Sequence, residues 1–322
     1  MKKLLQIAAA AVLLAQFGGV ANAQDAWPSR SVTMVVPFPA GGNADVIARE
    51  ISQHLTEKLG KTFVVENKSG AGGNIGGTYV AKAKPDGYTF LFSTPAPLAL
   101  NKLMYKSMPY DPEAELQPVV LVSRSPLIIV TKPGGIKTVK ELIEFAKANP
   151  GKLNVGHPGN GTLGHITTVF LQKLADVKVT DVPYRGTTPL MTDLLGGQID
   201  VAIDFLTTYV PLVKDGKLNA LAVTTTQPSF QLPTVPTATS VGLPGFDASA
   251  WYAVVAPKGT PDAIVNTVNK AVNEWLVSER GKKSLAQNGM DAIGGSPADL
   301  NAFIATELKK WAPLIKDAKI EL

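Results

Sequence analysis

Hydrophobic positions in this chain follow two alternating periods. Short apolar runs, the length of a buried strand, give way to stretches in which apolar residues recur every three or four positions, as on one face of a helix. The first such pair is Val32–Val36, which we interpret as a buried strand, and a helix that carries Ile47, Ile51 and Leu55 on one face and ends at Gly60. The pattern recurs almost to the end of the chain and is typical of an α/β protein with largely parallel sheets.

The same periods predict the remaining elements. In the first half we expect strands at 63–65 and 89–92 and a helix at 75–83 between them. In the middle, two strands at 119–122 and 127–130 are expected on either side of Ser123–Pro126. Further strands are expected at 153–155, 201–203, 218–223 and 251–256, and further helices at 138–149, 162–174, in the segment ending at 195, from Pro261 onward and at 297–318.

The chain is long enough to form two lobes. Its 322 residues approach the length at which one hydrophobic core divides. We expect lobe 1 to contain both chain ends, residues 24–123 and 227–322, and lobe 2 to be the inserted segment 124–226, with hinges near Ser123–Pro126 and Thr224–Gln227. The segment 227–246 is rich in Pro, Thr and Gly and predicts an ordered loop.

The first residues predict export. Lys2 and Lys3 precede an apolar run from Leu4 to about Val20, and Ala21-Asn22-Ala23 follows. This order is typical of a signal peptide at 1–23, cleaved after Ala23; a membrane anchor is the alternative interpretation. The chain has no cysteine, so we expect neither a lipid anchor on a new N-terminal cysteine nor disulfides. The prediction is a periplasmic protein that is free in solution.

Charge excludes one class of partner. The formal net charge is +5, and the basic residues are scattered along the chain. Nucleic-acid binding needs a clustered basic stripe, so we expect no nucleic-acid partner. A mild positive bias is compatible with a small anionic ligand.

Two glycine-rich turns are the first candidates for a binding site. Pro37–Asp45 and Ser69–Gly77 each lie where an apolar strand gives way to a helix. Glycine lets the backbone approach a ligand, and the first N–H groups of a helix have no internal acceptor, so we expect both turns to share one anion pocket. Asp45 has an equally good alternative role as a helix-start residue. The candidates in this half are Phe38, Ala40, Gly41, Gly42, Asn43, Asp45, Gly72, Gly73, Asn74, Ser93 and Thr94.

A second group of candidates lies in the predicted lobe 2. Arg185 could clamp a distal carboxylate with its guanidinium, although an arginine at a strand end is often only solvated. Asp204 could accept a hydrogen bond from the ligand or could cap the helix that follows it. The candidates in this half are Asn160, Gly161, Thr162, His165, Tyr184, Arg185, Gly186 and Asp204.

Other chemistry finds little support in the sequence. A dinucleotide fingerprint that began at Gly70 would need a third glycine where Ile75 stands, and a phosphate loop that ended at Gly60-Lys61-Thr62 would need a glycine at Leu55. His54, His157 and His165 have no metal-ligand spacing, so we expect no metal and no cofactor. An enzyme would depend on Ser93, His165 and Asp204, which the sequence alone does not bring together.

These residues together resemble a known family. Pro37-Phe-Pro-Ala-Gly-Gly-x-x-Asp45, Glu66-Asn-x-x-Gly-Ala-Gly-Gly73, Ala83-x-Pro-Asp-Gly-Tyr-Thr89, Tyr184-Arg-Gly186 and Leu194-Leu-Gly-Gly-x-x-Asp200 occur in this order. They are similar to the motifs of the Bug-type extracytoplasmic solute receptors, the binding proteins of tripartite tricarboxylate transporters. The resemblance extends over nearly all of the chain after Ala23.

The resemblance implies a fold and a function. The expected fold is a two-lobed, type II-like periplasmic binding protein in which each lobe is a mostly parallel sheet flanked by helices. The expected protein is a monomer without enzymatic activity that closes on a small organic carboxylate and delivers it to membrane permease subunits. A receptor for a sensor kinase and a secreted enzyme on the same scaffold are the alternatives.

Overall fold

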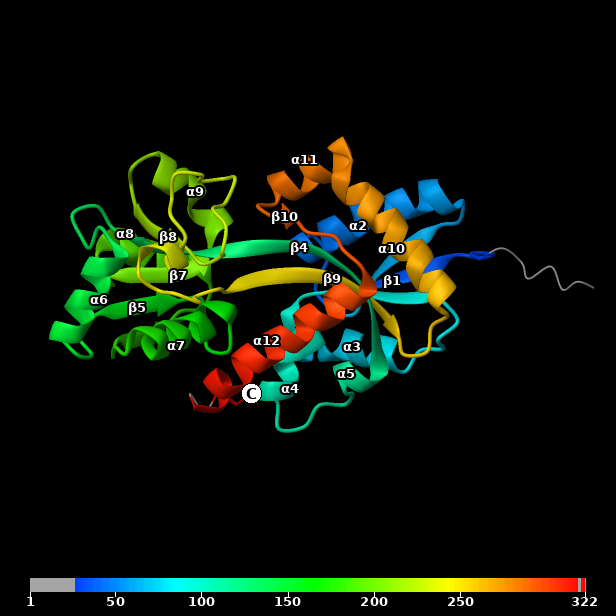
Figure 1. The fold of residues 1–322 in the computed structure, drawn as a ribbon, viewed down its shortest axis with the longest axis horizontal. Coiled ribbons are helices and arrows are strands. Elements are labelled where there is room, and N and C mark those ends of the chain that lie inside the picture. Colours follow the sequence, from blue (N-terminus) through cyan, green and yellow to red (C-terminus); the bar gives the residue numbers. More distant parts are fainter. Residues whose placement is uncertain (1–26, 318–319, 322) are drawn as a thin grey trace, which may run out of the picture.

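Two α/β lobes lie side by side and are connected by long strands (Figure 1). The structure is a computed structural model that describes residues 27–317, 320 and 321. The predicted signal peptide at 1–23 lies outside the described residues. Because two lobes with mixed sheets are present, the predicted α/β, two-lobed architecture is confirmed.

Lobe 1 contains both ends of the described chain. Its strands are β1 (Val32–Val36), β2 (Phe63–Asn67), β3 (Thr89–Ser93), the first part of β4 (Leu116–Thr131), β9 (Ser249–Pro257) and β10 (Asp291–Ala292). Its helices are α2 (Asn43–Leu59), α3 (Asn74–Ala81), α4 (Asn101–Met104), α5 (Pro112–Glu115), α10 (Asp262–Val277), α11 (Glu279–Gln287) and α12 (Pro297–Asp317), with shorter turns η2 (Ala71–Gly73) and η3 (Ala96–Leu100).

Lobe 2 is the inserted middle of the chain. Its strands are the second part of β4, β5 (Asn154–His157), β6 (Thr180–Pro183), β7 (Val201–Phe205) and β8 (Asn219–Val223). Its helices are α6 (Val139–Ala148), α7 (Leu163–Ala175), α8 (Thr187–Gly196) and α9 (Leu206–Lys214), with the short helix η4 (Ala238–Val241).

The sheets are mixed rather than mostly parallel at their centre. Strands β2, β1 and β3 are parallel, as are β6, β5 and β7, and these are the strand–turn–helix units that the periodicity predicts. The central strands β9 and β4 run antiparallel to their neighbours. The parallel character therefore belongs to the outer strands of each lobe, and the two lobes share one continuous path of strands through β4.

Strand β4 corrects one prediction. Ser123–Pro126, expected to separate two strands, continues a single strand in which Arg124 pairs with Trp251 and Pro126 with Ser249. The ladder then changes partner, since Leu127 pairs with Phe205 of β7. A proline lacks an N–H for the ladder, and Pro126 stands at the change of partner, where this loss is tolerated.

Each lobe has its own hydrophobic core. In lobe 1, Ile47, Ile51 and Leu55 of α2 pack with the buried side of the sheet, which explains the spacing of these residues. In lobe 2, Ala238, Leu243 and Phe246 pack in the same cluster as Leu127 and Val155. The expected loop at 227–246 thus packs with lobe 2, although the sequence placed it in lobe 1.

The lobes also meet through the C-terminal helix. The side chain of Trp311 on α12 is fully buried, and its ring lies 5.7 Å from that of Phe170 on α7, edge to face. Ile166 of α7 and Leu100 and Met104 of lobe 1 belong to the same cluster. Figure 1 shows α12 running along the lower side of lobe 1 toward lobe 2. An apolar contact therefore supplements the strand connections between the lobes.

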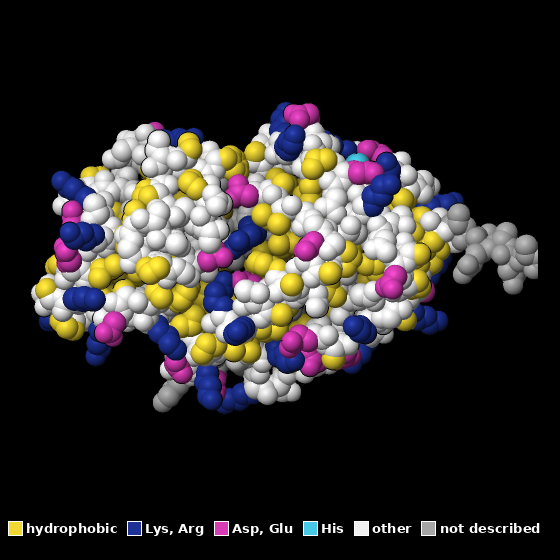
Figure 2. All heavy atoms as spheres, in the orientation of Figure 1, with side chains coloured by type: hydrophobic (Ala, Val, Ile, Leu, Met, Phe, Trp, Pro, Cys, Tyr) yellow, Lys and Arg dark blue, Asp and Glu magenta, His cyan; other side chains and the backbone are white. Residues whose placement is uncertain are grey.

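Surface charge is mixed on the face seen in Figure 2. Blue Lys and Arg side chains are interspersed with magenta Asp and Glu side chains over both lobes. Among the described residues, no helix is both long enough and apolar enough to cross a bilayer.

Candidate ligand-binding cleft

The first glycine turn connects β1 to α2 and is held by Asp45. Gly41 has a φ of 86°, in the left-handed region that favours glycine. The Gly41 N–H donates to Asp45 Oδ2 at 2.9 Å. Arg49 Nε also donates to Oδ2 at 2.9 Å, and Asn67 Nδ2 donates to Oδ1 at 2.9 Å. Both oxygens of Asp45 are therefore occupied by groups of its own lobe, and this carboxylate fixes the turn.

These bonds lower the pKa of a buried carboxyl group. The hydrogen bond from Arg49 is the largest cause, followed among the lowering contributions by the bonds from Gly41 and Asn67, and together they lower the pKa of Asp45 to about 2 despite its burial. Asp45 is thus ionised at neutral pH, and its charge is balanced by Arg49, whose side chain is half exposed.

A cavity of about 450 Å³ lies between the lobes at the N-terminus of α2. Helix α2 begins after Gly42, and its first internal bond is from Val46 N–H to the Gly42 carbonyl. The N–H groups of Asn43 and Ala44 therefore have no acceptor within the helix. The wall residues are mostly apolar: Phe38, Gly42, Asn43, Ala44, Thr94, Pro95, Ala96, Leu100, Met104, Gly161, Thr162, Leu163, Phe205, Ala250 and Tyr252.

The second glycine turn lies behind the cavity rather than in its wall. A Cβ on Gly73 would meet Pro97 at 3.0 Å and Phe38 at 3.5 Å, so Gly73 must stay small for these residues to pack on it. Asn101 Nδ2 donates to the Gly72 carbonyl at 3.0 Å and to Asn74 Oδ1 at 2.7 Å. This turn supports Phe38 from behind, whereas the expectation was a pocket shared by both turns.

Strand ends contribute further wall residues. Thr94, one residue after β3, lines the cavity, whereas the hydroxyl of Ser93 is fully buried and has no hydrogen-bond partner among the described residues. Tyr252 of β9 also lines the cavity and stacks on Phe92 at 5.8 Å. Burial raises the pKa of Tyr252 to about 12, so its hydroxyl keeps its proton at neutral pH.

Lobe 2 contributes the turn that precedes α7. Thr162 caps this helix: its hydroxyl donates to the Gly159 carbonyl at 2.6 Å and accepts from the His165 N–H at 3.4 Å. The Gly161 N–H donates to His165 Nδ1 at 3.1 Å. Gly161, Thr162 and Leu163 line the cavity, and the exposed Asn160 does not.

Two histidines and an aspartate support this turn. The rings of His157 and His165 stack at 4.7 Å, and their Nε2 atoms lie 3.0 and 3.7 Å from the two oxygens of Asp181. Sequence spacing did not predict this cluster, because Asp181 comes from β6. Burial lowers the pKa of His165, and the neighbouring His157 adds to this, while Asp181 opposes it. His165 is therefore neutral at pH 7 and accepts the Gly161 N–H.

The remaining lobe 2 candidates are engaged elsewhere. Tyr184 donates to Asp193 at 2.8 Å, and Arg185 is exposed and does not line the cavity. Gly186 precedes α8 with a φ of 109°. Asp204 is buried and accepts from Thr187 Oγ1 at 2.6 Å, the Phe205 N–H at 2.7 Å and the Tyr209 hydroxyl at 3.2 Å. Burial raises its pKa.

Ser93, His165 and Asp204 do not form a hydrogen-bonded group. His165 bonds to Gly161 and faces Asp181, Asp204 has the three partners given above, and Ser93 has none among the described residues. The structure therefore does not assemble the arrangement on which the enzyme alternative depends.

Several wall residues were missed by the sequence analysis. They are Ala44, Pro95, Ala96, Leu100, Met104, Leu163, Phe205, Ala250 and Tyr252. One signal was available: Phe205 comes two residues after the predicted strand at 201–203, and ligands in such sheets bind beyond the carboxyl ends of strands. Ala44 and Leu163 stand next to predicted candidates at the starts of α2 and α7. The others depend on how β9 and the segment after β3 pack, which has no local signature.

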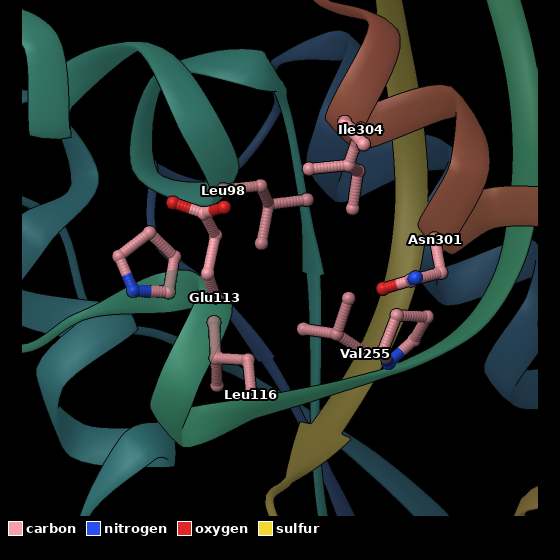
Figure 3. Close-up of a pocket in the computed structure, with 9 residues that line it drawn as sticks. Leu98, Glu113, Leu116, Val255, Asn301 and Ile304 are labelled. Atoms are coloured by element: carbon pink, nitrogen blue, oxygen red, sulfur yellow. The ribbon is translucent and has the colours of Figure 1, made fainter. Parts of the chain in front are cut away.

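Another cavity, of about 200 Å³, lies within lobe 1 (Figure 3). The figure shows Ile304 and Asn301 of α12 on one side and Glu113 and Leu116 on the other. A carboxylate there would face the acid of Glu113, and lobe closure would not bury it. The cavity between the lobes is therefore the better candidate for an anion.

Comparison with known proteins identifies the class. Residues 47–320 match the model of the "Tripartite tricarboxylate transporter family receptor", TctC. The chain therefore belongs to this family, and the resemblance seen in its motifs is confirmed.

Two relatives illustrate the similarity. A protein of the tcbD–tcbE intergenic region of Pseudomonas sp. strain P51 is 38% identical, with 92% of this chain and 88% of that protein covered. Protein BugT of Bordetella pertussis is 36% identical, with 92% of each chain covered.

Solved structures of the family have the same fold. Rpa4515 of R. palustris with adipate is 39% identical, with a TM-score of 0.75 and coverage of 92% of this chain and 99% of that one. MatC of Rhodopseudomonas palustris with bound malate is 32% identical, with a TM-score of 0.70 and coverage of 90% and 100%. A TctC solute-binding protein from Polaromonas without ligand is 26% identical, with a TM-score of 0.82 and coverage of 90% and 99%.

Proposed function

We propose that this protein captures a small carboxylate-bearing solute between its lobes and delivers it to the membrane subunits of a tripartite tricarboxylate transporter. The family membership and the adipate-bound and malate-bound relatives support a carboxylate as the solute. The proposed location is the periplasm, and the proposed state is a monomer that performs no chemistry on its ligand.

One observation carries the proposal: the start of α2 opens into the cavity between the lobes. The N–H groups of Asn43 and Ala44 lack internal acceptors, and both residues line the cavity. Hydrogen bonds to a charged acceptor are roughly twice as strong as neutral ones, and the positive end of the helix dipole adds to them. A carboxylate can therefore be held there without a buried cation, with Asp45 keeping the turn in place.

Similarity to two solved structures indicates which form of the two lobes is present here. The structure is more similar to the ligand-free Polaromonas protein, with a TM-score of 0.82, than to the adipate complex, at 0.75, although sequence identity has the opposite order. We infer that this structure is the open form. A ligand that contacts both walls shifts the population toward a closed form, which the membrane subunits can then recognise.

A ligand screen tests the proposal. In a thermal-shift screen of mono-, di- and tricarboxylates, a ligand at 100 times its Kd should stabilise the protein by about 2.7 kcal/mol. The uncharged amide of the best ligand should not stabilise it. If no carboxylate shifts the melting temperature, or if acid and amide act equally, the proposed function is wrong.

Two neighbouring hydroxyls provide a matched pair for the site. Thr94→Val should weaken binding of the best ligand about tenfold, because the cavity loses a hydroxyl. Ser93→Ala removes a hydroxyl that is buried away from the cavity wall and should leave Kd unchanged. Calorimetric titration of both variants measures this, and equal effects would place the ligand elsewhere.

A further inference from the structure

Building on the proposed function, we propose that the solute is a monocarboxylate whose single charge is held by lobe 1 and whose uncharged, apolar body faces lobe 2. Medium-chain aliphatic and aromatic monocarboxylates have this chemistry. The inference distinguishes this chain from its relatives with adipate and malate, both of which are dicarboxylates.

The lobe 1 wall presents several polar groups without partners. The N–H groups of Asn43 and Ala44 are free at the helix start, and the side chains of Asn43, Thr94 and Tyr252 make no hydrogen bond with other described residues. Tyr252 is only 9% exposed, so its unpartnered hydroxyl belongs to the cavity rather than to the outer surface. A carboxylate can accept two or three N–H bonds and more from hydroxyls, and lobe 1 provides them.

The lobe 2 wall has used its polar groups internally. The Gly161 N–H is bonded to His165, and the Thr162 hydroxyl and N–H are both bonded to the Gly159 carbonyl. The N–H groups of Leu163 and Gly164 at the start of α7 have no acceptor within the helix, and of these two residues only Leu163 lines the cavity. The lobe 2 wall therefore offers the Leu163 N–H as its helix-start donor, beside the apolar side chains of Leu163 and Phe205.

Lobe closure does not change the difference in available hydrogen-bond donors between the lobe 1 wall and the lobe 2 wall. All the bonds that occupy the lobe 2 donors lie within lobe 2, so a rigid-body movement of the lobes preserves them. A second carboxylate would be pressed against Phe205, which is 37% exposed in the open form. The carboxyl of Asp204 accepts from the backbone N–H of Phe205, and no Lys or Arg is among the wall residues.

The cost of a second charge decides between the two ligand classes. Removing a carboxylate from water costs several kcal/mol unless hydrogen bonds or a cation compensate for it. One helix N–H is not enough, because a buried carboxylate usually needs two or three donors. An apolar chain or ring at the same place gains free energy from contact with Phe205, Leu163 and Met104.

Matched pairs of acids test the inference on the unmodified protein. Hexanoate and adipate have six carbons each and differ in the second carboxylate. Benzoate and terephthalate share one aromatic ring and likewise differ in the second carboxylate. By calorimetric titration at pH 7.5, the monocarboxylate of each pair should bind at least about tenfold more tightly. Equal or stronger binding of the diacids would overturn the inference and leave the carboxylate receptor intact. Failure of all four acids, together with citrate and malate, would instead count against the proposed function.

A variant in lobe 2 should reverse the preference. Phe205→Arg places a cation opposite the carboxylate site, so adipate should gain at least about tenfold over hexanoate relative to the unmodified protein. Phe230→Arg is the control, because Phe230 is a similarly exposed phenylalanine that does not line the cavity. An unchanged preference in Phe205→Arg, or an equal change in Phe230→Arg, would show that the ligand body does not face lobe 2.

Discussion

Replacing Asp45 with asparagine should weaken ligand binding by about tenfold or more and destabilise the fold by about 2 kcal/mol at pH 7. The three partners of Asp45, the Gly41 N–H, Arg49 and Asn67, are all donors, and the amide of asparagine would direct its own donors at one of them. The turn that shapes the carboxylate site would then rearrange. Chemical denaturation and calorimetric titration measure the two effects.

The stability effect has a defined pH dependence. Because the folded-state pKa of Asp45 is about 2, below the ordinary value of 3.8, its contribution is present above pH 3.8 and disappears as the pH falls toward 2. The two proteins should therefore converge in stability as the pH falls through 2. Asp299→Asn is the binding control: Asp299 also accepts bonds at a helix start, from Ser296, but it lies on α12. If Asp45→Asn binds as tightly as Asp299→Asn, Asp45 does not shape the site.

Replacing Trp311 with alanine should cost about 3–5 kcal/mol of unfolding free energy, since it empties a fully buried position. It should also alter ligand affinity, because Trp311 packs on Phe170 of lobe 2 and thereby joins the lobes. Trp311→Phe keeps a ring but loses the indole bond to Glu307, 3.0 Å long, and should cost about 1 kcal/mol.

Trp275 on α10 provides the matched control for Trp311 on α12. It is also fully buried, but it lies in the core of lobe 1. Trp275→Ala should therefore lose comparable stability in urea unfolding and leave Kd nearly unchanged under conditions where it remains folded. If Trp311→Ala loses less than about 1 kcal/mol, or if both variants affect Kd alike, α12 does not act as an apolar connection between the lobes.

Local sequence signals predicted those helices and strands whose formation depends on residues close together in the sequence. Helix α2, with its apolar face and its end at Gly60, follows from periodicity and glycine chemistry alone. The continuity of β4 through Pro126 could not be predicted in this way, because it depends on pairing with β9, which lies more than a hundred residues away in the sequence. The same applies to Phe246, which packs with lobe 2 because of tertiary contacts.

Sequence reasoning reached the helix starts that open into the cavity, which is the proposed site, and missed most of the residues along its walls. Gly42, Asn43, Thr94, Gly161 and Thr162 line the cavity as expected. Asp45 and His165 instead hold the turns, and Arg185 is exposed, because whether a polar side chain reaches a ligand depends on what its own lobe offers it. Apolar wall residues such as Leu100 and Met104 have the same sequence signature as core residues.

A crystal structure of the complex with the tightest-binding carboxylate of the screen tests the central claim most directly. We expect the ligand in the cavity between the lobes, with its carboxylate oxygens about 2.7–3.1 Å from the backbone nitrogens of Asn43 and Ala44. A ligand bound in the lobe 1 cavity of Figure 3, or a carboxylate without contact to the start of α2, would contradict the account.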